Sequence, residues 1–267
     1  MEAAITTDGT DINSILTRRD EPPGASAGVL RGVLFDLDDT LFDHHHGARA
    51  ALQRVHAAYA SFLVTPFAAF EQAHAEHLET LHLQVLSGAL DIDTARVERF
   101  RRLLIHAGAE GDEAAAAAAL YRESYIAARQ AVAGAHELLA ALRARARVAV
   151  VSNNLLAEQQ QKMTQCGLTP LVDALIVSEA VGFTKPDQRI FAVALDRLEL
   201  RPDEAVMVGD SWPADIVGAT QAGIAAVWFN PRHLPVPDPN LKVPELHSLH
   251  PADHAIDVIV SAHAHRR

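Results

Sequence analysis

Five short apolar segments recur along the chain, and they constrain its fold more than any other feature. Each is four residues long, and they lie at residues 32–35, 148–151, 174–177, 205–208 and 225–228. Apolar runs of this length are typical of strands buried on both faces of a parallel sheet. Segments with helical patterns separate the later runs, at residues 155–166, 187–198 and 213–222. The alternation predicts an α/β fold in which helices cover a parallel sheet.

The first two predicted strands are separated by more than a hundred residues, far more than one helical crossover requires. Residues 43–132, within this interval, are rich in Ala, Leu, Gln, Glu, Arg and His and nearly free of β-branched runs. That composition favours a bundle of about four helices. We therefore expect an all-helical domain at residues 43–132, inserted into an α/β core formed by residues 29–42 and 133–267.

The two ends of the chain differ in composition from the segments between them. Residues 1–28 are polar and contain Pro22-Pro23-Gly24, which predicts a flexible N-terminal extension. Residues 230–251 are rich in Pro and His, which predicts an extended surface segment. The apolar residues at 256–260 predict one further element near the C-terminus.

Composition and charge exclude several classes of partner. Lys and Arg number 23 and Asp and Glu number 34, so the formal net charge is −11 and nucleic acid is a poor partner. Cys166 is the only cysteine, as expected in a reducing compartment. The chain has no apolar run near the roughly 20 residues needed to span a bilayer, and its first thirty residues lack a signal-type apolar region. We expect a soluble cytoplasmic protein with no membrane partner.

Acidic side chains follow two of the predicted strands. Asp36 and Asp38 come directly after the first strand, and Asp210 comes after the fourth, with Asp215 five residues later. Ligands of open parallel sheets bind beyond the carboxyl ends of the strands. We therefore expect these four carboxylates to gather at one edge of the sheet. Asp215 also fits an ordinary acid in the first turn of a helix, where the helix dipole favours it.

Polar groups of other kinds are predicted at the same edge. Ser152 and Asn153 follow the second strand, and Lys185 precedes a helix after the third. Clustered carboxylates repel one another, and hard oxygen donors without His or Cys favour Mg²⁺. A nearby ammonium and a hydroxyl are the groups that a phosphoryl ligand requires. The sequence thus predicts a site for Mg²⁺ and a phosphoryl group.

Four motifs in this order resemble those of the haloacid dehalogenase superfamily, a group composed mainly of phosphate-transferring hydrolases. The motifs are DLDDTL at 36–41, VVSN at 150–153, Lys185-Pro186, and VGDS at 208–211 followed by Asp215. The resemblance covers residues 31 to about 229, and the predicted helical insertion falls where the family has its cap domain. It implies a Rossmann-like core with a helical cap.

The resemblance also implies roles for individual residues. Asp36 corresponds to the nucleophile that becomes an aspartyl phosphate, and Asp38 to the general acid and base. Ser152, Asn153 and Lys185 correspond to the residues that bind the phosphoryl oxygens.

The same resemblance implies a Mg²⁺ site. Asp36, the backbone carbonyl of Asp38, and Asp210 correspond to the metal ligands. Asp215 corresponds to a supporting residue that acts through metal-bound water or by orienting Lys185.

One position separates the branches of this superfamily. Haloacid dehalogenases carry a tyrosine where this chain has Asp38, and a tyrosine is poorly suited to exchange protons near neutral pH, so Asp38 favours phosphate-ester hydrolysis. Residues 151–195 are similar to the subgroup of pyrimidine 5′-nucleotidases and acylneuraminate phosphatases, including Gln159 and Lys162. Asn154 departs from that subgroup, which often has glycine there.

The expected activity is therefore Mg²⁺-dependent hydrolysis of a small phosphorylated metabolite. Nucleoside monophosphates, sugar phosphates and phosphoglycolate all remain open as substrates, and the sequence does not indicate an oligomeric state. A phosphomutase would use the same groups but pass the phosphoryl group to a sugar hydroxyl instead of water. A receiver-type signalling module also gathers acids, a hydroxyl and a lysine on a parallel sheet, but the helical insertion argues against it because a receiver needs no lid.

Overall fold

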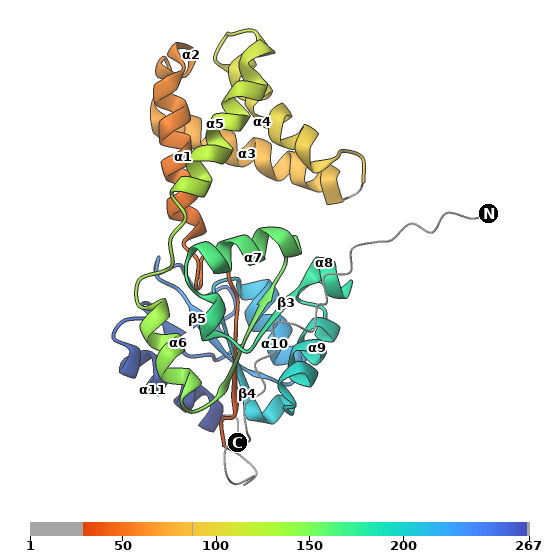
Figure 1. The fold of residues 1–267 in the computed structure, drawn as a ribbon, viewed down its shortest axis with the longest axis vertical. Helices are drawn as coiled ribbons and strands as arrows, with labels where there is room; N and C mark the ends of the chain where they lie inside the picture. Colours follow the sequence, from red (N-terminus) through yellow and green to blue (C-terminus); the bar gives the residue numbers. More distant parts are fainter. Residues whose placement is uncertain (1–28, 87, 266–267) are drawn as a thin grey trace, which may run out of the picture. The chain divides into compact units, whose positions relative to one another are not determined.

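The chain forms two compact units, shown in Figure 1. The computed structural model describes residues 29–86 and 88–265, so the predicted flexible extension at residues 1–28 lies outside the described residues. One unit contains the described residues up to Phe42 and from Ala131 onward, and the other is Asp43–Gln130. In the described parts of the chain, no helix combines the length and the apolar character that crossing a membrane would require.

The first unit is built on a six-stranded sheet in the order β3-β2-β1-β4-β5-β6, with every neighbouring pair parallel. The α/β fold with a parallel sheet is confirmed, and all five predicted strands are present to within one residue at each end. The sixth, β6, is additional to them and lies in the segment predicted to be an extended surface stretch. The strands are β1 (Gly32–Phe35), β2 (Arg147–Ser152), β3 (Ala174–Val177), β4 (Ala205–Gly209), β5 (Ala225–Phe229) and β6 (Glu245–Leu246).

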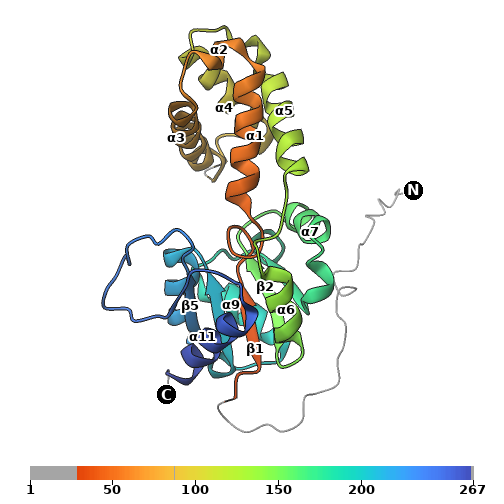
Figure 2. The ribbon, with the colours of Figure 1, turned by 90° about the vertical axis from the view of Figure 1, so that its left-hand side faces the viewer.

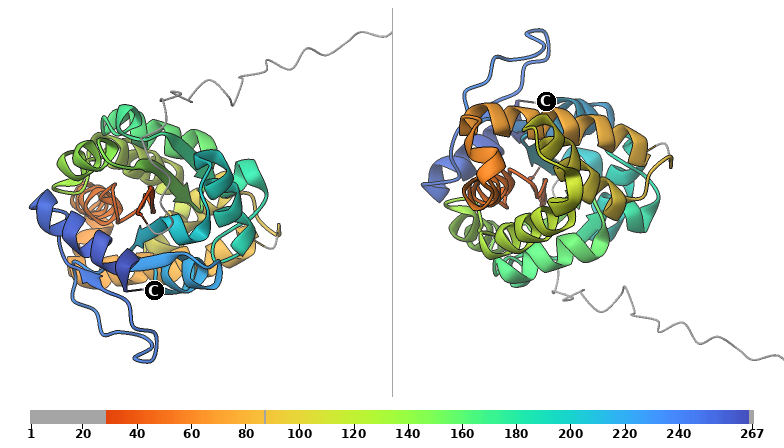
Figure 3. Two further views of the ribbon diagram at one scale, coloured as in Figure 1. Left: turned by 90° about the horizontal axis from the view of Figure 1, so that it is seen from below. Right: turned by 90° about the horizontal axis from the view of Figure 1, so that it is seen from above.

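Helices cover both faces of the sheet, as Figures 2 and 3 show. Helix α9 (Gln188–Leu198) packs on β2 and β3, and α10 (Gly218–Gln221) packs beside it, against β5. Helices α6 (Ala135–Arg143) and α11 (Ala252–Ala264) pack on the other face. Five apolar residues of α9 are buried in the core on its side of the sheet: Ile190, Phe191, Ala194, Leu195 and Leu198. The late element predicted near the C-terminus is α11, whereas α6 is additional to the predicted elements.

Shorter elements complete this unit. Helix α7 (Leu156–Gln165) follows β2, and α8 (Ser178–Val181) follows β3. Two 3₁₀ turns, η3 (Thr169–Leu171) and η4 (Pro202–Glu204), precede β3 and β4.

The helix predicted over residues 213–222 is divided into two parts. A π-helical turn, η5 (Trp212–Val217), comes before α10, and the Ile216 amide donates to the Ser211 carbonyl five residues back (3.4 Å). The wide turn brings Asp215 beneath Gly209, where a Cβ atom would lie 2.3 Å from an Asp215 carboxylate oxygen. Turns of this type often occur at functional sites.

The second unit is entirely helical within its described residues. Four longer helices surround a core that includes Val55, Phe62, Phe70, Phe100 and Leu104. Asp43 and Asp91 accept backbone N–H bonds at the starts of the first and third of them. The elements are α1 (His44–Ala58), α2 (Ala60–Leu63), α3 (Phe67–Leu86), α4 (Ile92–His106), η2 (Gly111–Glu113) and α5 (Ala114–Ala127).

A histidine and an arginine are buried inside the helical unit. His74 is only 4% exposed, and its ring lies 5.8 Å from that of Phe100 and 5.5 Å from that of Tyr121. The Arg99 guanidinium lies 5.0 Å from the centre of the Tyr121 ring. Burial, and then the positive charge of Arg99, lower the pKa of His74 to about 2, so the ring is neutral in the folded protein.

We expect the helical unit to lose stability as the pH falls, because His74 takes up a proton far more readily in the unfolded chain. The stability gained by burying His74 in its neutral form is fully present above the pKa of about 6.5 that the ring has in the unfolded chain. It declines as the pH drops toward the pKa of about 2 that the ring has in the folded protein. Between pH 6.5 and 5.5, the free energy of unfolding should fall by about 1 kcal/mol less in the His74→Phe variant than in the wild type. Urea unfolding at several pH values measures it. The exposed His254→Phe variant is the control, and equal pH dependence in wild type and His74→Phe would contradict the assignment.

Gly134 is required by a close backbone approach at the start of α6. Its φ is +87°, and a Cβ atom there would lie 2.8 Å from the backbone nitrogen of His250 and 2.8 Å from the carbonyl carbon of Leu249. An L side chain would be strained in this conformation and would also push the segment before α11 away.

We expect Gly134→Ala to lower the free energy of unfolding by about 2 kcal/mol or more, because strain and overlap add together. Gly182→Ala is the matched control, since Gly182 also has a positive φ of +76° but nothing within 4 Å of the added Cβ. That variant should lose only about 1 kcal/mol, the cost of the conformation alone. Urea unfolding compares the two, and equal losses would contradict the predicted overlap.

Candidate active site

A buried lysine joins three elements at the carboxyl edge of the sheet. The Lys185 ammonium donates to Asp36 Oδ1 at 2.6 Å, just beyond β1, and to the carbonyl of Val151 in β2 at 2.7 Å. It also forms an ion pair with Asp215 Oδ1 in η5 at 2.7 Å. Asp36 and the Val151 carbonyl each accept one of the three donors of the ammonium, and Asp215 balances its charge. An anion bound here would compete with Asp36 or Asp215 for a donor.

The backbone of Lys185 is held by the side chain of Asn153. The Asn153 amide donates to the Lys185 carbonyl at 2.9 Å and accepts from the Lys185 N–H at 2.8 Å. This reciprocal pair ties the loop after α8 to the end of β2. The Asn153 side chain therefore orients Lys185 in this structure, and its predicted contact with a phosphoryl group stays a prediction.

Three carboxylates gather around the single Lys185 ammonium. Asp36, Asp210 and Asp215 each offer an oxygen, and these oxygens lie within 4.8 Å of one another. Burial raises the pKa of Asp36 well above its ordinary value, and the negative charges of Asp215 and Asp210 raise it further. The positive charge of Lys185 lowers it, but not enough to offset them. Burial and the neighbouring acids Asp215 and Asp39 raise the pKa of Asp210 to about 7. Three ionised acids facing one ammonium would carry an excess of negative charge.

This excess fits a divalent cation. The donors are hard carboxylate oxygens, and the residues in the cluster include no His or Cys, a set that suits Mg²⁺ better than zinc or copper. The positive charge of a bound cation would lower the pKa of Asp36 and of Asp210 and so favour their ionised forms. Lys185 alone does not supply enough positive charge to do this.

Smaller contacts fix the orientation of these acids. Thr40 Oγ1 donates to Asp36 Oδ2 at 3.4 Å and accepts from the backbone N–H of Asp210 at 3.2 Å. The indole N–H of Trp228 donates to the Asp210 carbonyl at 2.8 Å. The Ser211 N–H donates to Asp215 Oδ2 at 3.0 Å. The loops after β1 and β4 are thus joined directly.

The Asp38 side chain belongs to a separate group on α7. Lys162 Nζ lies 2.5 Å from Asp38 Oδ1, and Gln159 Nε2 donates to Asp38 Oδ2 at 2.8 Å. Asn154 also donates to Asp38 Oδ2, at 3.3 Å. The same Gln159 nitrogen donates to Ser152 Oγ at 2.6 Å.

The structure therefore distributes the predicted site residues between two groups. Asp36, Lys185, Asp210 and Asp215 meet in one, with Asn153 supporting Lys185. Asp38 and Ser152 are linked through Gln159 in the other.

Thr40, Gln159 and Lys162 are among the contributing side chains that had no predicted role. A signal for Gln159 and Lys162 exists on α7, where the buried positions 159, 162 and 163, together with 166 just after the helix, follow helical spacing. Gln159 and Lys162 occupy that buried face as polar residues, which is unusual for a helix that packs on a core.

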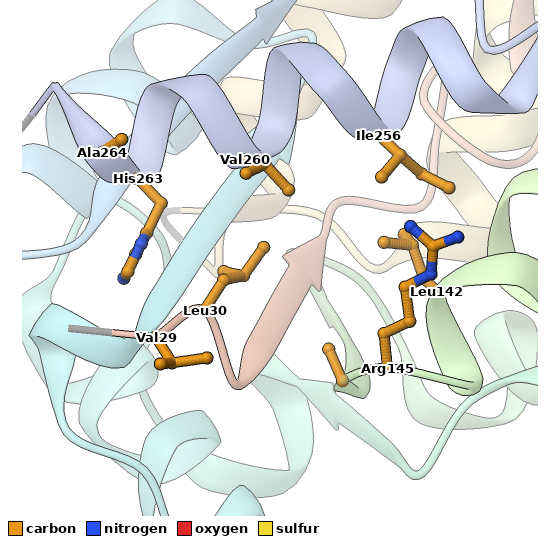
Figure 4. A pocket seen from close by; sticks show the side chains of 9 residues that line it. Val29, Leu30, Leu142, Arg145, Ile256, Val260, His263 and Ala264 are labelled. Atoms are coloured by element: carbon orange, nitrogen blue, oxygen red, sulfur yellow. The ribbon is translucent and has the colours of Figure 1, made fainter. Parts of the chain in front are cut away.

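A separate hollow lies at the opposite end of β1, and Figure 4 shows its lining. Its volume is about 490 Å³, and it is bounded mainly by apolar side chains, among them Leu30, Leu142, Ile256 and Val260. The His263 ring in its wall contacts the Asp203 carbonyl at 2.9 Å. A phosphate ester needs several polar partners, so this hollow does not suit one.

Comparison with known proteins gives consistent matches. The family model described as haloacid dehalogenase-like hydrolase matches residues 30–223, which include all four motifs. The ribulose-1,5-bisphosphate 5-phosphatase of Halopiger xanaduensis is 32% identical over 234 residues, which is 85% of this chain and 95% of the relative. The pyrimidine 5′-nucleotidase YjjG of Escherichia coli is 30% identical over 231 residues, 81% of this chain and 95% of the relative.

Solved structures agree with the fold. The crystal structure of the HAD-hydrolase YfnB from Bacillus subtilis, bound to magnesium, superposes with a TM-score of 0.68 at 26% identity. The superposition covers 86% of this chain and 99% of that one.

We expect Lys185→Met to destabilise the first unit by roughly 3 kcal/mol at pH 8, since it leaves Asp36 and Asp215 buried without their cation. Burial already holds the pKa of Asp36 well above its ordinary value, and removing the Lys185 charge, which lowers that pKa, would raise it further. The difference in the free energy of unfolding between wild type and Lys185→Met should therefore grow as the pH rises and shrink toward pH 5. Unfolding in urea at the two pH values measures it.

Lys242→Met is the control for this prediction, because Lys242 is exposed. It should change stability little at either pH. A Lys185→Met protein with a deficit that is the same at pH 5 and pH 8 would contradict the charge balance described for this cluster.

Proposed function

Because the chain belongs to the haloacid dehalogenase-like hydrolases, we propose that it is a Mg²⁺-dependent phosphatase of small phosphorylated metabolites. The observation that carries the proposal is the meeting of Asp36, Asp210 and Asp215 around Lys185 at the carboxyl edge of the sheet. The names of its relatives support the same reaction class, since both hydrolyse phosphate esters.

The reaction proceeds in two steps. An oxygen of Asp36 attacks phosphorus in line with the ester bond, and the phosphorus–oxygen bond to the alcohol breaks while Asp38 gives the leaving oxygen a proton. Asp38 then takes a proton from water, whose oxygen attacks the phosphorus of the aspartyl phosphate. Inorganic phosphate leaves and Asp36 is regenerated. Both proton transfers require the Asp38 carboxyl group to be separate from the nucleophile.

The phosphoryl oxygens are bound by two groups from neighbouring strands. Ser152 is the last residue of β2, and its hydroxyl oxygen already accepts from Gln159, so its own proton can be donated to a phosphoryl oxygen. Lys185 redirects one of its three donors from a carboxylate to the incoming anion. Charge on the transition state is thereby offset where it develops.

Mg²⁺ would be held by Asp36, the backbone carbonyl of Asp38, and Asp210, with Asp215 in support. When bound, it supplies positive charge that offsets the three clustered carboxylates and the phosphoryl oxygens. The magnesium in the YfnB crystal structure supports this choice of ion.

The substrate is a small phosphate ester. Nucleoside monophosphates, sugar phosphates and phosphoglycolate are all candidates, and the two relatives act on two of these classes by name. The similarity of residues 151–195 to pyrimidine 5′-nucleotidases favours testing nucleoside monophosphates first.

We expect Asp36→Asn to lower turnover on the order of 10³-fold or more, because the amide replaces the attacking oxygen. The measurement is phosphate release from a metabolite panel with Mg²⁺, repeated after chelation, which should abolish activity. Asp196→Asn, an exposed change on α9, is the matched control and should retain activity.

Three results would contradict this proposal. Undiminished activity of Asp36→Asn would exclude Asp36 as the nucleophile, and full activity after chelation would exclude the metal. Conversion of a sugar phosphate to its isomer without free phosphate would indicate a phosphomutase.

A further inference from the structure

We propose that Lys162 and Gln159 of α7 are positioning residues that fix the orientation of the Asp38 carboxylate. This inference rests on the proposed function, in which Asp38 exchanges protons with the leaving group and with water. It concerns residues that act through Asp38 and need not touch the substrate.

Each Asp38 oxygen has its own donor on α7. Lys162 Nζ holds Oδ1 at 2.5 Å, and Gln159 Nε2 holds Oδ2 at 2.8 Å. Two donors on two different oxygens fix both the position and the plane of a carboxylate, which a single bond would leave free to rotate. A proton donor must lie within hydrogen-bond reach of the atom it protonates, so this orientation bears directly on the reaction.

The burial of these residues is costly unless it serves such a role. The Lys162 residue is 2% exposed and Gln159 is fully buried. Met163 occupies the adjoining buried position on α7, as expected for a helix that packs on a core. An ammonium and an amide at such positions lose hydration, and Asp38 supplies the compensating charge. The Phe42 ring, whose centre lies 5.0 Å from Lys162 Nζ, provides a further favourable contact.

Gln159 also links Asp38 to the predicted phosphate-binding hydroxyl. Its Nε2 atom donates to Ser152 Oγ at 2.6 Å as well as to Asp38. Asp38, which would protonate the leaving oxygen, and Ser152, which would donate to a phosphoryl oxygen, are therefore held by one amide nitrogen. This arrangement favours a shared positioning role over simple attachment of α7 to the sheet.

The test compares two substrates that differ in their need for a proton. An alkyl phosphate that the enzyme hydrolyses in the metabolite panel has a poor leaving group and requires a general acid. 4-Nitrophenyl phosphate releases a stable phenolate anion and does not require one. We expect Lys162→Met to lower kcat/KM for the alkyl ester about tenfold or more and for 4-nitrophenyl phosphate by less than about threefold. Gln159→Leu should change the ratio in the same direction, and it provides the result if Lys162→Met does not fold.

The matched control is Gln161→Met, an exposed substitution on the same helix that should leave both values unchanged. Thermal melting of each variant shows whether it is folded. Equal losses on both substrates, or no loss on either, would overturn the positioning role while leaving the phosphatase proposal intact. A wild-type protein that hydrolyses no phosphate ester would overturn the proposed function, and this inference with it, before any variant is made.

Discussion

The contacts of the Lys185 ammonium are the interaction on which the site depends. This one group reaches an acid beyond β1, a carbonyl of β2 and an acid of the π-helical turn after β4, all at 2.6 to 2.7 Å. The three elements come from distant parts of the chain, and the parallel pairing of β1 with both β2 and β4 brings their carboxyl ends together. The parallel sheet thus brings the three elements to one edge, and the contacts of the Lys185 ammonium hold them together there.

The two candidate acids of the reaction have different electrostatic surroundings. Asp36 lies among Asp210 and Asp215 with one shared ammonium, a cluster whose excess negative charge suits a cation. Asp38 lies two residues away but is paired with Lys162 and Gln159 of α7. Separate partners would allow the proposed roles, in which Asp36 is the nucleophile and Asp38 exchanges protons, since each role needs its own protonation behaviour.

Much of this arrangement could be predicted from the sequence because it depends on local patterns. Buried strands such as β1 and β3 were identifiable from four apolar residues in a row, and their polar termini indicated where the acids would meet. The short strand β6 could not be identified from the sequence, because two residues in a Pro- and His-rich segment carry no periodic signal. The π-helical turn depends on the close approach of Asp215 to Gly209, a contact that helical periodicity does not encode. The pairing of Lys162 with Asp38 also depends on tertiary packing, although polar residues on the buried face of α7 were a usable signal.

The central claim is that Asp36 carries the phosphoryl group during turnover. The most direct measurement is to mix the enzyme with a ³²P-labelled ester and Mg²⁺, quench it in acid during steady state, digest it and locate the label by mass spectrometry. We predict a labelled peptide containing residue 36, with the phosphoryl group on the Asp36 carboxylate. Steady turnover with no labelled protein, or a label on another residue, would contradict it.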